Sequence, residues 1–223
     1  MHRFKTLILA SAATLSVLGL GLSACGPRPE PAAPPAAVSA NDNAMMHHPS
    51  PDGGPAAAFR SDESTMDERM MAAVGATADH TWAMKMVEHH RGAIAMSRTV
   101  LGESSDPDIR RMASKVVEAQ TTEVADLETW LADHGGHQPG SVNPFATADR
   151  SMHERMMGVT GSTVDLVWAR KMRAHHQGAI DMNEILLSSS KDPTLRKMAQ
   201  MMIDMQRKEI AELDKWLAGH MTS

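Results

Sequence analysis

The sequence has few aromatic residues and only one cysteine. Among its 223 residues there is no Tyr, with 3 Phe and 4 Trp, and Cys25 is the single Cys, which excludes an intramolecular disulfide. No stretch alternates apolar and polar residues with the period of two that predicts a β-strand. Neither His-Glu-x-x-His nor a recognisable nucleophile motif occurs in the sequence. The sequence therefore gives no sign of a β-rich fold, of a zinc protease or of nucleophilic catalysis.

The net charge argues against partners that are held by a basic surface. It is −5 at pH 7, and removal of residues 1–24, which contain Arg3 and Lys5 but no acid, would bring it near −7. Nucleic acid and anionic lipid bind proteins through Lys and Arg side chains that neutralise phosphate. We therefore expect neither as a partner.

The N-terminal residues have the pattern of an export signal and are left out of fold reasoning. After the two basic residues, residues 7–22 are apolar or small, and this stretch is shorter than the roughly 20 residues of a comfortable membrane span. The Leu-Ser-Ala-Cys segment that ends at Cys25 resembles the lipobox of bacterial lipoproteins, in which the Cys becomes the lipidated first residue. We expect residues 1–24 to be a lipoprotein signal peptide, and Cys25 to anchor the chain in the cell envelope, facing the periplasm.

The segment that follows predicts an extended tether. Residues 25–60 hold eight of the twelve prolines, together with many Ala, Ser, Asn and Gly, and such a segment cannot bury enough apolar surface to offset its ordering entropy. Met45-Met46-His47-His48 lies within it, either by chance in a biased segment or as a flexible metal-capturing patch. Gly26, at a position where Asp would favour the inner membrane, favours the outer membrane.

An internal duplication fills the rest of the chain. Residues 66–134 align without a gap onto residues 152–220 at a constant offset of 86, and all four Trp fall in matched pairs. We therefore expect helical repeats at 61–135 and 151–223, joined by a Gly- and Pro-containing linker at 136–150. The alignment leaves open whether the two repeats share one bundle or form two.

Each repeat predicts a short helix followed by a long antiparallel helical hairpin. Thr65 and Ser151 begin candidate capping boxes, which would start short helices near residues 66–74 and 152–160. Apolar residues spaced by three and four predict the next helices over about 79–101 and 165–187. An Asp-Pro pair at 106 and again at 192 suits the start of the third helix. The sequence thus predicts an all-α fold of two tandem units.

The second helix of each repeat carries the same Met/His motif. The motif is Met-x-x-His-His-x-Gly-Ala-Ile-x-Met, and its candidate metal ligands are Met86, His89, His90, Met96, Met172, His175, His176 and Met182. Residues three and four apart are neighbours on a helix, so the first Met and both His of each copy can converge. Thioether sulfur suits Cu(I), imidazole accepts copper generally, and free thiolates would be oxidised outside the cytosol. The motif therefore predicts copper, with Cu(I) favoured over Cu(II).

Methionine and histidine also have structural roles, which compete with this interpretation. A Met stripe commonly fills a core, and we expect this of Met70, Met71, Met112, Met156, Met157, Met198 and Met201. His134 and His220 end the third helices, where they either cap the helix dipole or bind metal. His80 and His153 have no counterpart in the other repeat and are expected at the surface.

Two further matched pairs have competing interpretations. Lys85 and Lys171 fit either a solvated face or ion pairs inside the bundle. Gly92 and Gly178 lie in mid-helix, where Gly costs about 1 kcal/mol relative to Ala. Their presence predicts close approach by another helix or by a ligand.

The motif, with a downstream Gln-x-x-Glu and Trp-Leu, resembles the family called domain of unknown function 305. The downstream residues are Gln120, Glu123, Trp130-Leu131 and Gln206, Glu209, Trp216-Leu217, and the resemblance covers both repeats. It implies a ferritin-like helical-bundle fold. Some tandem members of the family are periplasmic copper binders linked to copper resistance, so the resemblance also implies copper binding through the eight motif residues.

We therefore expect a periplasm-facing copper-binding lipoprotein that sequesters or chaperones copper and catalyses nothing. Its partners would be copper ions and the membrane reached through Cys25, with a copper exporter or a second copy of the chain as further candidates. Two alternatives stay open: a structural or adaptor lipoprotein whose Met are only core, and a ferritin-like metalloenzyme. Against the enzyme, Glu88 is followed three residues later by Arg91, where a di-iron site needs Glu-x-x-His.

Overall fold

Two matching sets of three α-helices make up residues 53–220, the part of the chain that the computed structural model describes. The sets are α1 (Arg60–Ala72), α2 (Ala78–Glu103) and α3 (Pro107–Asp133), then α4 (Ala146–Met157), α5 (Val164–Ser189) and α6 (Pro193–His220), with a 3-10 helix, η1 (Pro55–Phe59), before α1. Within these residues only isolated bridges at Gly75 have β character, and the all-α prediction is confirmed. The predicted signal peptide, Cys25 and the Met/His patch at 45–48 lie outside the described residues, as do 221–223.

The long helices begin at residues whose side chains satisfy the first free N–H groups. Thr77 and Thr163 accept from the backbone N–H three residues on, at the starts of α2 and α5. Asp106 accepts from two backbone N–H groups at the start of α3, and Asp192 accepts from one in α6. The predicted Asp-Pro starts are therefore confirmed, because Asp caps each helix and Pro needs no N–H partner in its first turn.

The short helices begin earlier than the sequence predicts. α1 starts at Arg60 and α4 at Ala146, so the predicted capping residues Thr65 and Ser151 lie inside helices. Phe59 and Phe145, which are related by the repeat offset, are fully buried just before them. Helical structure therefore begins at residue 55 in the first repeat and at residue 146 in the second. The boundaries predicted at 60 and 150 are wrong because these buried anchors precede the stretch in which the repeats align well.

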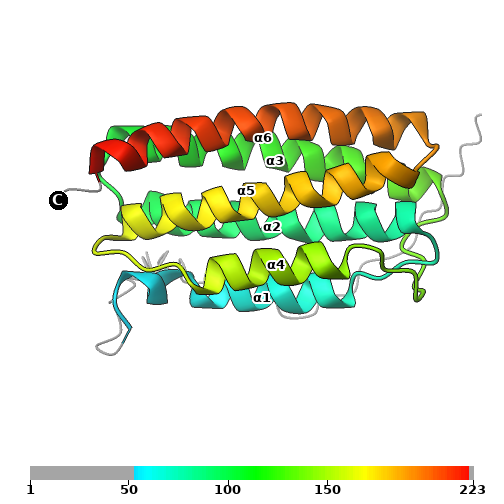
Figure 1. The fold of residues 1–223 in the computed structure, drawn as a ribbon, viewed down its shortest axis with the longest axis horizontal. Helices are drawn as coiled ribbons and strands as arrows, with labels where there is room; N and C mark the ends of the chain where they lie inside the picture. Colours follow the sequence, from blue (N-terminus) through cyan, green and yellow to red (C-terminus); the bar gives the residue numbers. More distant parts are fainter. Residues whose placement is uncertain (1–52, 221–223) are drawn as a thin grey trace, which may run out of the picture. The chain divides into compact units, whose positions relative to one another are not determined.

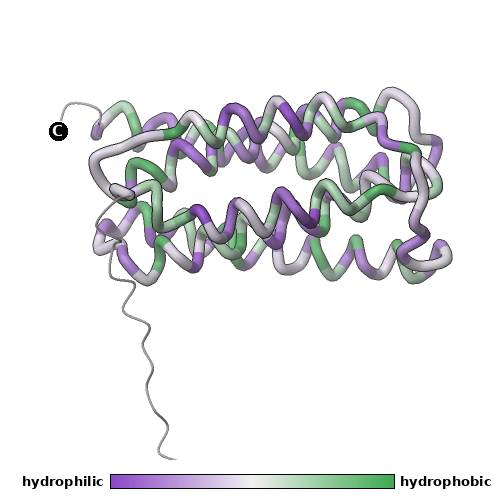
Figure 2. Tube along the Cα trace, turned by 90° about the horizontal axis from the view of Figure 1, so that it is seen from below, coloured by the Kyte–Doolittle hydropathy of each residue, from purple (hydrophilic) through white to green (hydrophobic). Residues whose placement is uncertain are grey.

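The two repeats share one bundle, in which each layer takes one helix from each repeat (Figure 1). α2 packs against α5 in the middle, with α3 and α6 on one side and α1 and α4 on the other. The described helices belong to one compact unit, which answers the question that the alignment left open. Hydrophobic and hydrophilic residues alternate in short runs along the long helices (Figure 2), as in helices that bury one face. No helix within residues 53–220 has the length and apolar character that crossing a bilayer requires.

Two buried lysines tie the repeats together. Lys85 on α2 lies 2.7 Å from Asp149 on α4, and Lys171 on α5 lies 2.5 Å from Glu63 on α1. Each ammonium also donates to a carbonyl near the end of the short helix of its own repeat. Each repeat thus supplies one lysine to an acidic residue of the other repeat and one acidic residue to the lysine of the other repeat. Of the two interpretations of these lysines, ion pairs inside the bundle is the correct one.

Gly92 and Gly178 lie where each short helix crosses the long helix of its own repeat. A Cβ added to Gly92 would lie 2.4 Å from the sulfur of Met66, and one added to Gly178 would lie 2.6 Å from the sulfur of Met152. Helix packing this close leaves no room for a methyl group unless the methionines move. The predicted close approach is confirmed, and the neighbour is a methionine of the short helix.

Candidate metal site

Four fully buried histidines, two from α2 and two from α5, occupy the middle of the bundle. His89 and His175 face each other across the contact between these helices, with ring centroids 3.5 Å apart. Nε2 of His89 lies 3.2 Å from the carbonyl oxygen of His175, and Nε2 of His175 lies 3.1 Å from the carbonyl oxygen of His89. The two copies of the motif therefore meet at the centre of the molecule.

This central pair is neutral and keeps a free lone pair on each ring. Burial lowers the pKa of His89 and of His175 well below its usual value, and the neighbouring imidazoles lower it further. Because a carbonyl oxygen can only accept, Nε2 carries the proton and Nδ1 carries the lone pair. Within the described residues neither Nδ1 atom has a hydrogen-bond partner. Each ring can therefore offer Nδ1 to a metal without first losing a proton.

The second histidine of each pair faces a glutamate on the other long helix of its repeat. Nε2 of His90 lies 3.0 Å from Oε2 of Glu123 on α3, and Nε2 of His176 lies 3.1 Å from Oε2 of Glu209 on α6. These contacts lack hydrogen-bond alignment, and all four ring nitrogens of His90 and His176 lack a hydrogen-bond partner within the described residues. Two more imidazoles with unused nitrogens thus lie beside partly buried carboxyl groups.

Burial sets the charge state of the His176–Glu209 contact. It lowers the pKa of His176 to about 3, with a further contribution from His90. It raises the pKa of Glu209 to about 7, with a further contribution from Glu123. The imidazole is therefore neutral at physiological pH, and the carboxyl group is close to its midpoint between the acid and the carboxylate.

A small cavity lies beside this contact, between the two repeats. Its volume is about 10 Å³, close to the space that one water-sized sphere occupies. Its walls include Met112 from α3, Met172 and His176 from α5, and Glu209 from α6. Two thioethers from different repeats therefore reach the same small space as an imidazole and a carboxyl group.

The eight predicted ligands are all fully buried, and the two adjacent histidines of each repeat face different partners. Consecutive residues on a helix point about 100° apart. His89 accordingly points at the other repeat, while His90 points at Glu123 of its own hairpin. The two rings therefore have different partners although their centroids lie 5.7 Å apart, and the convergence of Met86, His89 and His90 stays a prediction. Met96 and Met182 lie in the hydrophobic core.

Met112 and Glu209, two cavity residues that could assist metal binding, were not among the predicted ligands. Met112, expected to be core, is 5% exposed and also lines the cavity. Its position beside His176 could not be predicted, because the two residues belong to different repeats. Glu209 could have been found, since it recurs as Glu123 after a buried glutamine in both copies.

Three other histidines have structural contacts. His80, expected at the surface, is only 9% exposed, because its ring packs edge-on against Trp130 and Nε2 lies 2.9 Å from the carbonyl oxygen of His134. His134 and His220 stack on Trp130 and Trp216 at the ends of their helices. Their Nδ1 atoms each lie 2.7 Å from a carbonyl of the last turn. These contacts agree with the capping role proposed for both.

The side chains around His90 and His176, which we call the lateral histidines, favour a soft metal ion. Within residues 53–220, no three His, Cys, Asp or Glu side chains converge in a way that could hold a metal ion. One imidazole and one carboxyl group leave zinc or calcium short of ligands, because zinc takes about four and calcium six or more. Thioethers would have to complete the shell, and thioethers select soft ions such as Cu(I).

The family model described as domain of unknown function (DUF305) matches residues 36–131 and, again, residues 79–217. The chain belongs to the DUF305 family. The two matched ranges overlap at residues 79–131 and together reach into both repeats. A comparison with the curated proteins found no match.

Solved structures with a similar fold include two DUF305 proteins and CopM. A DUF305 protein from Streptomyces coelicolor is 21% identical with a TM-score of 0.55, covering 64% of this chain and 93% of that one. A DUF305 fragment from Deinococcus radiodurans is 22% identical with a TM-score of 0.52, covering 63% and 95%. CopM in its Cu(II)-bound form is 23% identical with a TM-score of 0.51, covering 64% and 98%. At these identities the likeness shows a shared fold.

Proposed function

We propose that this DUF305 protein binds copper, Cu(I) in preference to Cu(II), and holds it without transforming it. The observation that carries the proposal is the set of buried imidazole nitrogens that have no hydrogen-bond partner and lie beside thioethers. A buried polar atom without a partner is costly, and a bound metal would supply that partner. CopM, which has a similar fold, is described in Cu(II)-bound and Ag-bound forms, which supports the same kind of cargo here.

The chemistry of the ligands favours capture of a monovalent ion in an oxidising compartment. The proposed ligands are the four buried histidines with Met86 and Met172, assisted by Met112 and Glu209 at the cavity. Thioethers and neutral imidazoles carry no charge, so a Cu(I) ion bound by them keeps a single positive charge, which the neighbouring carboxyl group can balance. Such a protein would lower the free copper concentration in the envelope or pass the ion to an exporter.

Substitution of His90 and His176 tests the proposed copper binding. Combined His90→Leu and His176→Leu substitutions should lower the apparent affinity for Cu(I) by about tenfold or more, since even outer-shell partners of metal ligands contribute that much. Leu keeps the buried positions filled, so helicity should be retained and circular dichroism can check it. The affinity is measured anaerobically on the full chain by competition with a chromogenic Cu(I) chelator.

The matched control removes two histidines that are exposed. His137 and His153 are each 48% exposed and each face a carboxylate, so His137→Ala with His153→Ala should leave Cu(I) binding unchanged. Equal affinities for the two double variants would contradict the site. A wild-type protein that binds no Cu(I) above trace would contradict copper binding itself and favour the structural or adaptor role.

We further propose that the protein is lipid-anchored at Cys25, faces the periplasm and lies in the outer membrane. The proposal is supported by the lipobox-like Leu-Ser-Ala-Cys segment and by Gly26. Cys25→Ala should move the protein out of the membrane fraction, because stable anchoring depends on the attached acyl chains. Fractionation with labelled palmitate checks this, with Ser39→Ala as the control. Equal membrane association of the two variants would contradict the anchor.

A further inference from the structure

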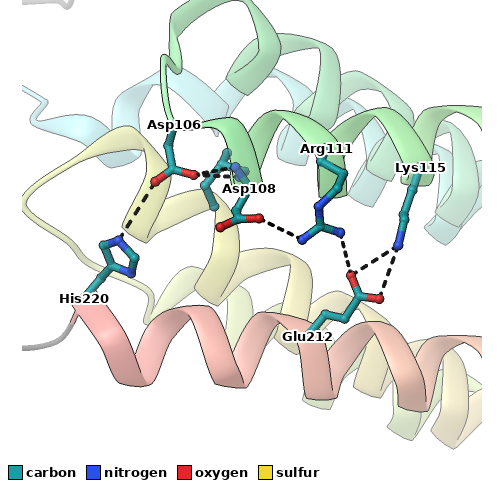
Figure 3. Close-up of polar contacts among 7 residues, drawn as sticks. Asp106, Asp108, Arg111, Lys115, Glu212 and His220 are labelled. Atoms are coloured by element: carbon teal, nitrogen blue, oxygen red, sulfur yellow. Dashed lines mark hydrogen bonds and ion pairs between the residues drawn. The ribbon is translucent and has the colours of Figure 1, made fainter.

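The register of α3 against α6 is fixed by polar contacts along both helices. At one end, the indole Nε1 of Trp130 donates to Asp192 over 3.3 Å. Further along, Lys115 lies 3.2 Å from Glu212 (Figure 3). The helices are therefore antiparallel, and positions on α3 face positions on α6 whose numbers fall as those on α3 rise. Figure 3 also shows His220 directed at Asp106 at the far end.

On one side of the contact between α3 and α6, the ammonium group of Lys115 lies beside the small cavity next to His176 and Glu209. Lys115 is among the residues that line the cavity with Met112, Met172 and His176. Its Nζ lies 3.2 and 3.3 Å from the two carboxylate oxygens of Glu212, which lines the same cavity. A cation that entered here would meet a resident positive charge.

At the position that the repeat offset relates to this cavity, the ammonium of Lys115 is replaced by the thioether of a methionine. The counterpart of Lys115 is Met201, and the counterpart of Glu212 is Asp126. The counterpart of Met112 is Met198. Met201 is 59% exposed, so its predicted place in the core is wrong, as it is for the exposed Met71 and Met157. Met198 packs half-buried against the core. The second position thus has thioethers that reach from the surface inward and no lysine in the equivalent place.

The buried end of this second position also has unused donor atoms. The counterparts of Met172 and His176 are Met86 and His90, which are fully buried. Both ring nitrogens of His90 lack a hydrogen-bond partner within the described residues, although Glu123 lies 3.0 Å away. The second position therefore combines three thioethers, one imidazole and a nearby carboxyl group.

We propose that a soft monovalent cation, Cu(I) or Ag(I), binds first at this position, through Met198, Met201, Met86 and His90, and that Lys115 weakens binding at the cavity on the other side. The inference rests on the proposed function and names which of two repeat-related positions is loaded. Exposed Met201 gives the ion its first ligand, and the thioethers behind it replace its water. The two repeat-related positions thus differ: one has an exposed methionine as its first ligand, and at the other the positive charge of Lys115 repels a cation.

Exchanging the two residues tests this assignment. Ag(I), which does not change oxidation state in air, is titrated into the full chain with 13C-labelled Met methyl groups and followed by NMR, with signals assigned by single Met→Leu substitutions. In the wild type, the first equivalent should shift the signals of Met198, Met201 and Met86. Met201→Lys should weaken that binding by about tenfold or more, and Lys115→Met should tighten a second equivalent, seen at Met112 and Met172, by a similar factor.

The control places the same charge on an exposed methionine of another helix. Met71, on α1, is 71% exposed, and Met71→Lys should leave the titration unchanged. If Met201→Lys behaves like Met71→Lys while the wild type still binds Ag(I), this assignment is overturned and soft-metal binding stands. If the wild type binds no Ag(I), both the assignment and the proposed function fail.

Discussion

Replacement of Lys171 with Met is expected to lower the free energy of unfolding by about 3 to 5 kcal/mol, the usual loss when one partner of a buried ion pair is removed. The side chains of Lys171 and Glu63 are 3% and 7% exposed, and they lie 2.5 Å apart. Without the ammonium, Glu63 is a buried carboxylate that has no counter-charge. Urea denaturation of the metal-free protein, followed by circular dichroism, measures the loss.

The loss should depend on pH in a defined direction. Burial already raises the pKa of Glu63 while Lys171 opposes it. Without Lys171 that pKa rises further, so the folded chain takes up a proton more readily than the unfolded one. A group with a raised folded-state pKa destabilises the protein increasingly as the pH rises above its unfolded value. The loss should therefore be larger at pH 8 than at pH 5.

Two further variants separate the buried pair from a general effect of losing a lysine. Lys115→Met removes a half-exposed lysine that also contacts a glutamate, and it should cost no more than about 1 kcal/mol. Lys171→Met combined with Glu63→Leu should recover most of the loss, because it removes the stranded charge. Equal losses for Lys171→Met and Lys115→Met would contradict this account of the buried pair.

These ion pairs explain how two repeats form one bundle without relying on apolar contact alone. Lys85 and Lys171 each take their acidic partner from the short helix of the other repeat. An arrangement in which the repeats slide by one turn would leave two buried lysines without their acidic partners. Hydrophobic packing is non-directional, so the lysine–acid ion pairs are what fix the position of one repeat against the other.

The long hairpins could be predicted from the sequence because their signals are local. Apolar residues three and four apart define α2 and α5, and Asp106 and Asp192 mark the starts of α3 and α6. The short helices could be placed only roughly. α1 buries Glu63 beside Met66 and Met70, so a charged residue occupies its inward face and hides the amphipathic pattern.

The sequence identified the buried histidines of the candidate site, but it identified neither all of its residues nor its geometry. The repeated motif identified the four buried histidines, and burial confirms that they are interior residues. Their partners come from contacts between repeats or along the hairpin, such as His89 with His175 and Met112 with His176. A single sequence shows spacing along one helix, but it does not show which helix lies opposite.

Glu209→Gln is expected to raise the free energy of unfolding at pH 8 by about 3 kcal/mol and to have little effect below pH 4.5. Burial raises the pKa of Glu209 to about 7, against an ordinary value of 4.5, and that difference corresponds to about 3 kcal/mol. Between these pH values the folded state binds more protons than the unfolded state, so stability falls as the pH rises and the full penalty is present above pH 7. Gln has nearly the same shape and no charge, so it removes the penalty.

The neighbouring Glu212 gives a control of opposite sign. Hydrogen bonds from Arg111 and Lys115 hold the pKa of Glu212 below its ordinary value. Its carboxylate therefore stabilises the folded state above pH 4.5, and Glu212→Gln should slightly destabilise the protein at pH 8. Unfolding free energies of the metal-free wild type and both variants, measured from pH 4 to pH 8, decide the matter. A Glu209→Gln profile parallel to that of the wild type would show that this carboxyl group titrates normally, and the site would then hold a full negative charge beside His176 at neutral pH.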